Sequence, residues 1–176
     1  MKTAQNDSQY TPLPVEEVFD GFEVAVADYQ SGQSALDSAG SVLERCRAQL
    51  DYAQLSVEEA DVQLEVVVMA FNSSTPESAE YPALAIELDL ATEAMLNATD
   101  VCEAAAANHQ MALEQYQSEL VSCEESFGLA NSLRVELSRS LDGLPGQAAS
   151  NDPQYQADDV LSSLSDTAYR FFRNSA

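Results

Sequence analysis

The side chains with the greatest chemical reactivity in this sequence are one histidine, His109, and three cysteines, Cys46, Cys102 and Cys123. Histidine and cysteine are ligand types that zinc prefers, but a zinc site needs four ligands, or three and a water molecule. Cys102 precedes His109 by seven residues, which is roughly 10 Å along a helix. One helix therefore cannot bring both to one ion. A metal or redox pair of His109 with Cys46 is the alternative to a polar residue that fixes helix register, and the ligand shortage favours the register role.

Other arrangements that carry chemistry do not occur in the sequence. A di-iron bundle needs Glu-x-x-His repeats, but Ala106 stands at the required position before His109. There is no Gly-rich phosphate loop, nucleophile elbow or EF-hand loop. The acidic pairs at 58–59, 124–125 and 158–159 have no calcium loop around them, so solvated helix faces explain them better than calcium binding. We expect no catalytic, cofactor or metal site, and a protein that is not an enzyme.

The charge of the chain limits its partners. Thirty acidic and seven basic residues give a net charge of −23, which repels nucleic acids and anionic membrane surfaces. The first residues lack the apolar core of a signal peptide. The longest apolar run, Val66 to Phe71, is far shorter than the roughly 20 residues that span a bilayer. We expect no cleavable signal, no membrane insertion, and a cytoplasmic location or incorporation into a particle.

The elements that position these residues follow from a repeat of seven. One row of apolar residues consists of Val15, Phe22, Tyr29, Leu36, Leu43, Leu50, Val57, Leu64 and Phe71. Three positions further on, a second row is small or β-branched throughout: Val18, Ala25, Gly32, Ala39, Cys46, Ala53, Ala60 and Val67. Paired rows of this kind form the seam of a coiled coil. They predict a helix over about 14–72, with Pro14 at its start and a bend at the glycines of residues 31–40 as the main threat to its continuity.

A second helix, over about 82–142, repeats this design after a turn at 72–76. Its seam row is Leu88, Met95, Cys102, His109, Tyr116, Cys123, Ala130 and Leu137, and its companion row is Leu84, Ala91, Ala98, Ala105 and Ala112, shifting afterwards to Leu113, Leu120 and Phe127. With the turn centred near residue 77, residue i faces roughly residue 154 − i in an antiparallel pair. A bridge between Cys46 and Cys102 would need a register slip, so we expect three free thiols.

The predicted fold is therefore all-α. An extended arm at 1–13 precedes a long antiparallel helical hairpin at 14–142, which has an Ala-rich, coiled-coil-like seam. A linker at 143–151 contains two glycines and a proline. A shorter amphipathic helix then covers 152–174, with Asp152 as its N-cap and Pro153 at its first position.

Two regions carry the features of a protein interface. Near the turn, both helices are apolar on more than one face, more than a two-helix tip can bury; the residues are Leu55, Val62, Val66, Met69, Ile86 and Leu90. Cover by the C-terminal helix is the alternative. The second region places two arginines and three aromatics within five positions, Tyr169, Arg170, Phe171, Phe172 and Arg173. Arginine and aromatic residues anchor interfaces, although a latch onto the acidic hairpin is equally compatible.

These features favour a non-enzymatic structural or assembly protein that binds protein subunits and self-associates within a larger complex, such as a virus particle. With its acidic helical hairpin and its tail containing Arg170 and Arg173, the chain resembles phage scaffolding proteins in shape and charge, without a shared motif. A second resemblance, to small helical-hairpin proteins of type VII secretion, implies a secreted hairpin protein or its partner. Those proteins carry a Trp-x-Gly turn, and this chain has no tryptophan. A metal-binding or enzymatic bundle is the third class.

The third class has a direct test, which is elemental analysis of the purified protein. We expect less than stoichiometric zinc and iron, because His109 lacks enough neighbouring ligands. One equivalent of either metal, retained after dialysis and lost on replacing His109 with alanine, would contradict this expectation.

Overall fold

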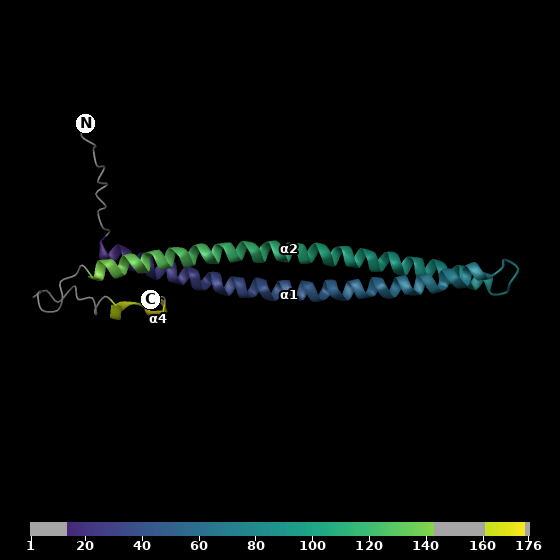
Figure 1. Cartoon of the computed structure of the whole chain (residues 1–176), viewed down its shortest axis with the longest axis horizontal. Helices are drawn as coiled ribbons and strands as arrows, with labels where there is room; N and C mark the ends of the chain where they lie inside the picture. The colour runs from purple at the N-terminus through teal and green to yellow at the C-terminus, as the bar shows by residue number, and fades with distance from the viewer. Residues whose placement is uncertain (1–13, 143–160, 175–176) are drawn as a thin grey trace, which may run out of the picture. The chain divides into compact units, whose positions relative to one another are not determined.

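The computed structural model describes residues 14–142 and 161–174. These residues contain α1 (Val15–Ser73), α2 (Tyr81–Asp142) and α4 (Asp166–Asn174). The two long helices pack against each other in opposite directions (Figure 1), which confirms the all-α hairpin with a shorter C-terminal helix. The predicted arm at 1–13, the linker at 143–151 and the first part of the C-terminal helix, 152–160, lie outside the described residues.

The start of α1 depends on Pro14. Its carbonyl oxygen accepts hydrogen bonds from the backbone N–H groups of Glu17 and Val18, at 3.0 and 3.2 Å. Proline has no N–H to lose at this point, and Glu16 and Glu17 lie at the positive end of the helix dipole. The expected threat of a bend at 31–40 does not materialise, because α1 runs unbroken through both of its glycines there and no described glycine has a positive φ.

The turn between the long helices is closed by its own side chains. The hydroxyl of Ser74 donates to the carbonyl oxygen of Phe71 at 2.8 Å, which ends α1. The rings of Phe71 and Tyr81 then pack with centroids 4.9 Å apart and join the two helices across the turn. Pro82 lies in the first turn of α2, as the sequence predicts.

Close contacts between glycines and the opposite helix fix the register. A Cβ at Gly32 would lie 3.4 Å from the Cα of Cys123, and a Cβ at Gly21 would lie 3.8 Å from the Leu133 side chain. The predicted register places residues 122 and 133 at these levels. All members of the two predicted α1 rows are buried or half-buried. The small side chains of the second row therefore allow the backbones to approach closely.

One part of the predicted α2 seam is wrong. The companion row does not move to Leu120 and Phe127, whose side chains are 36% and 43% exposed. It continues in step through Glu119, Ser126 and Leu133, which are half-buried. The apolar side chain of Phe127 instead packs beside Tyr29 of α1 and Phe171 of α4. Phe127 therefore lies on the flank of α2, where it packs against α4, and the sequence pattern alone placed it wrongly in the seam.

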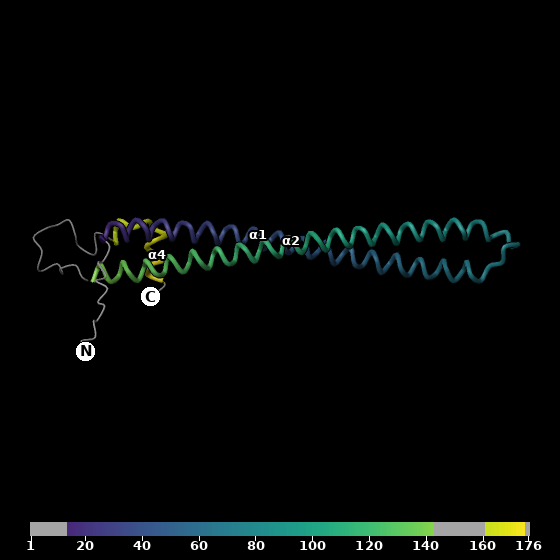
Figure 2. The backbone as a smooth tube through the Cα atoms, turned by 90° about the horizontal axis from the view of Figure 1, so that it is seen from above, coloured from purple at the N-terminus to yellow at the C-terminus, as the bar shows by residue number. Residues whose placement is uncertain are grey.

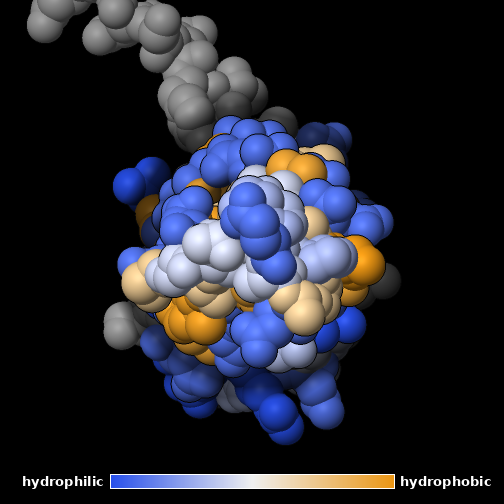
Figure 3. Space-filling model, turned by 90° about the vertical axis from the view of Figure 1, so that its right-hand side faces the viewer, coloured by the Kyte–Doolittle hydropathy of each residue, from blue (hydrophilic) through white to orange (hydrophobic). Residues whose placement is uncertain are grey.

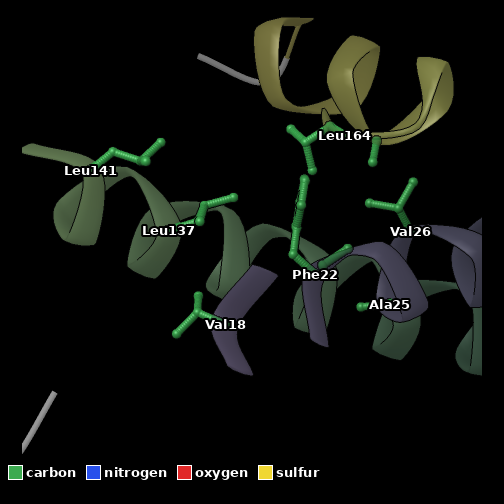
Figure 4. Packing of buried hydrophobic residues seen from close by; sticks show 9 residues of the cluster. Val18, Phe22, Ala25, Val26, Leu137, Leu141 and Leu164 are labelled. Carbon is green, nitrogen blue, oxygen red and sulfur yellow. The ribbon is translucent and has the colours of Figure 1, made fainter. Parts of the chain in front are cut away.

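The described residues divide into two compact units. The three-helix unit takes in residues up to 35 of α1, residues from 120 of α2, and α4; the two-helix unit is Leu36–Glu119. In the three-helix unit, α4 lies beside the first part of α1 and the last part of α2 (Figure 2). Phe22 rises from α1 and points toward Leu164, with Val26 and Leu137 nearby (Figure 4). A continuous core therefore forms among all three elements.

The C-terminal helix is interrupted, contrary to the single helix predicted over 152–174. Leu164 and Ser165 are not helical, although residues 161–163 are. The Ser165 hydroxyl accepts a hydrogen bond from the N–H of Ala168 at 3.3 Å, so Ser165 is the N-cap of α4. The Ser165 N–H donates to a carboxylate oxygen of Glu23 at 2.6 Å. The break places Leu164 in the core and ties the start of α4 to α1.

The two-helix unit has a much smaller core. Its buried apolar residues, among those described, are Ala39, Ala53 and Ala112, whereas the three-helix unit buries whole Phe, Leu and Val side chains. Because burial stabilises in proportion to apolar area, alanines contribute little per residue. This unit therefore depends on close helix packing and leaves most of its large apolar side chains outside the seam.

The glycines provide a matched test of the seam. Gly32→Leu would push a side chain into the Cys123 backbone, so we expect a loss of about 1–3 kcal/mol in the free energy of unfolding. Gly128→Ala meets no atom within 4 Å and should gain about 0.5–1 kcal/mol from helix propensity. Urea unfolding followed by circular dichroism measures both. A Gly32→Leu variant as stable as the wild type would show that the helices are not in close contact there.

Candidate protein interface

The six apolar residues predicted near the turn are all exposed. Their exposed fractions lie between 55% and 62%, in the set Leu55, Val62, Val66, Met69, Ile86 and Leu90. All six belong to the two-helix unit, whereas the described part of the C-terminal segment packs within the other unit. Cover by α4, the alternative considered from the sequence, is therefore not what the structure shows.

Four of the six residues gather along two adjoining grooves. The larger groove, of about 440 Å³, lies between α1 and α2 and is lined by Val62, Gln63, Val66, Val67, Glu87, Leu90, Ala91 and Ala94. The second lies along α1 and is lined by Leu55, Glu58, Glu59, Val62 and Gln63. Val62 belongs to both linings, so the two grooves form one surface. We call it the acid-rimmed groove, since its charged residues are all glutamates.

Met69 and Ile86 line neither groove. They flank the turn, where residues 68–76 and 81–86 contain no Asp, Glu, Lys or Arg and the four residues between these ranges contain two glutamates, Glu77 and Glu80. Viewed from the end that carries the turn, orange apolar patches lie beside pale, weakly polar atoms, and blue polar groups stand both at the centre and around them (Figure 3). We call residues 68–76 and 81–86 the uncharged turn end; they share no residue with the acid-rimmed groove. Here another acidic molecule would meet little repulsion from the residues that flank the turn.

Sequence reasoning missed several exposed apolar residues of the same unit. Tyr52 is 74% exposed, and Leu96, Val101 and Met111 are 59–62% exposed. Tyr52, Leu55, Val62, Val66 and Met69 follow one another at intervals of three, seven, four and three, a second apolar stripe on α1 broken only at Glu59. A search for a second heptad phase beside the main seam would have found this stripe.

The Arg and aromatic tail lies on its own chain. The Phe171 ring packs edge-on against Phe22, Tyr29 and Phe127, with centroids 6.0, 5.7 and 5.8 Å apart. Phe172 packs against Phe22 at 6.2 Å. Edge-on aromatic pairs add to the stability gained from burial. Of the two roles left open for the tail, the intramolecular latch is the contact observed, and a partner would have to displace α4 to reach these rings.

The polar residues of the tail face outward. Arg173 donates from Nε to the Tyr169 hydroxyl at 3.2 Å, and its guanidinium lies 5.6 Å from the centre of that ring. Arg170 is exposed and lines a shallow pocket with Phe127 and Phe171. α4 is therefore a short helix whose two phenylalanines pack against the acidic hairpin and whose two arginines are exposed.

The reactive side chains lie where the seam predicts. His109 is half-buried, as are Cys46 and Cys102, and Cys123 is buried; the three cysteines are free thiols. Within residues 14–142 and 161–174, no three side chains of the types His, Cys, Asp or Glu come together in a way that could hold a metal ion. Of these four residues, Cys123 lies against Gly32 of α1.

Replacing Phe171 tests how α4 is held. Because Phe171 is half-buried, we expect Phe171→Ala to weaken the attachment of α4 by about 2 kcal/mol, less than a fully buried phenylalanine loses. Amide hydrogen exchange in α4 should then rise about 30-fold. Tyr169→Ala is the control, since Tyr169 contacts Arg173 of the same helix. Equal exchange in both variants would show that the Phe171 ring does not hold α4.

None of the described helices offers the run of apolar residues that a membrane crossing requires. Comparison with protein-family profiles, with characterised proteins and with solved structures finds no match to this chain. The surfaces of the molecule are therefore the basis for proposing a function. They are the acid-rimmed groove, the uncharged turn end and the surface that binds α4.

Proposed function

We propose that this chain is a non-enzymatic structural subunit that binds other protein chains and self-associates within a larger assembly, such as a virus particle. The observation that carries the proposal is the uncovered apolar surface of the two-helix unit. Eleven large apolar side chains are exposed there, while the buried apolar residues described in this unit are alanines. Extended apolar surface of this kind is typical of interaction sites.

The large residues on the outer faces of α1 also indicate a protein partner rather than a small molecule. A small ligand is held in a concave pocket that covers most of its surface. The grooves here are open, and Val62, Val66 and Leu90 in their walls are 58–60% exposed. An open surface lined by both helices fits an extended partner such as another helix.

The net charge suggests where copies of the chain meet each other. Two molecules that each carry −23 repel one another at low ionic strength. The uncharged turn end combines the exposed side chains of Met69 and Ile86 with few carboxylates, since Glu77 and Glu80 are the two acids of the turn. Self-association through this end should therefore strengthen as salt screens the remaining charge.

Light scattering across a salt series tests the proposal. At low salt we expect the mass of the 19.0 kDa monomer, and at about 0.5–1 M salt, where the screening length falls to a few ångströms, a multiple of it. The double variant Met69→Gln and Ile86→Gln should remain a monomer at both salt concentrations, because it removes apolar contact area without adding charge.

The control is Leu129→Gln in the three-helix unit, where the side chain is 55% exposed. This variant should associate as the wild type does. A wild-type chain that stays monomeric at every salt concentration, and that retains no partner when used as bait, would contradict the proposed function.

A further inference from the structure

The acid-rimmed groove combines apolar walls with acidic edges, and this composition favours one kind of binding partner. Val62 and Val66 of α1 and Leu90 of α2 stand exposed in its walls, with Ala91 and Ala94 beside them. Its charged lining residues are Glu58, Glu59 and Glu87, with no lysine or arginine. We infer that this groove receives an amphipathic helix of another protein, with an apolar ridge flanked by Lys or Arg. The inference rests on the proposed function in taking the chain to be a protein-binding subunit.

The size of the groove suits a helix. Leu55 and Val66 are eleven residues apart on α1, or about 16 Å at 1.5 Å per residue. This distance corresponds to three turns of a partner helix. The alanines allow a ridge of larger side chains to approach the space between α1 and α2, which is how ridges and grooves pack between helices.

The three-helix unit of the same chain contains a contact of this kind. There, α4 places Phe171 and Phe172 against α1 and α2 while Arg170 and Arg173 stay exposed. The flank residues that receive α4, such as Val26 and Phe127, are apolar like those of the acid-rimmed groove. The described structure thus shows one amphipathic helix with arginines docked on this hairpin, and a second apolar surface without one.

The charge of the acid-rimmed groove favours a basic helix of another protein over a second copy of this chain as its occupant. A Lys-flanked or Arg-flanked helix brings cations to Glu58, Glu59 and Glu87, a favourable contact that steers association. A second copy docked groove to groove would bring its own glutamates to the same place, and like charges in contact are costly. The binding of a basic helix should weaken with salt, the opposite of the self-association at the uncharged turn end.

The test uses two synthetic helices of about 18 residues, roughly 27 Å long, with the same leucine ridge and with either Lys or Glu flanks. Fluorescence anisotropy measures their binding to the intact chain. We expect the Lys-flanked helix to bind and the Glu-flanked helix to bind at least tenfold more weakly. Val66→Gln with Leu90→Gln should weaken binding about tenfold, while Leu96→Gln, equally exposed but outside the groove, should not.

A charge-matched pair of variants separates the groove from the general attraction of an acidic chain. Replacing Glu58, Glu59 and Glu87 with Gln should weaken binding of the Lys-flanked helix about tenfold and flatten its salt dependence. The control removes three charges of the same unit away from the groove, with Asp51→Asn, Asp100→Asn and Glu103→Gln, and should bind nearly as the wild type does.

Three results would overturn the inference: equal binding of the two helices, equal losses in the two triple variants, or no binding of either helix. Salt-driven dimerisation abolished by Val66→Gln with Leu90→Gln would assign the groove to a second copy instead. Self-association that persists in these groove variants and is lost with Met69→Gln and Ile86→Gln would leave the proposed function intact while this inference fails.

Discussion

Close approach of two helices through small residues is the contact on which the rest of this structure depends. Gly32 lies against the backbone of Cys123, and alanines occupy the buried positions of the two-helix unit. Small residues let the backbones approach but remove little apolar area from water. The seam can therefore hold register without enclosing the larger side chains of the same helices. Those side chains need another surface to bury them.

The two units meet this need differently. In the three-helix unit, a segment of the same chain returns, and Leu164, Ala168 and the Phe171 ring complete a core around Phe22. In the two-helix unit, nothing in the described residues covers Val62, Val66 or Leu90. This contrast supports a binding role for the exposed surface, because the same two helices bind a third helix, α4, in the three-helix unit.

Much of the fold could be predicted because one signal, the seven-residue repeat, decides most of it. The repeat and the turn residues located both long helices, their register and the exposed apolar surface near the turn. It could not locate the break at Leu164 and Ser165, because amphipathic spacing continues across it and the hydrogen bond from Ser165 to Glu23 joins residues far apart in sequence. The predicted seam position of Phe127 was wrong for a related reason. An apolar residue on a helix flank looks the same whether it packs against the opposite helix or against a third one.

The central claim is that the apolar surface of the two-helix unit is open in the single chain and becomes covered on assembly. Hydroxyl-radical footprinting of the low-salt and high-salt forms tests it most directly, since methionine reacts readily when exposed. Met69 and Met111 are 55% and 59% exposed, and only Met69 lies at the uncharged turn end. The account predicts that both react in the low-salt form and that Met69 alone becomes protected in the high-salt form. Assembly that leaves the reactivity of Met69 unchanged would contradict it.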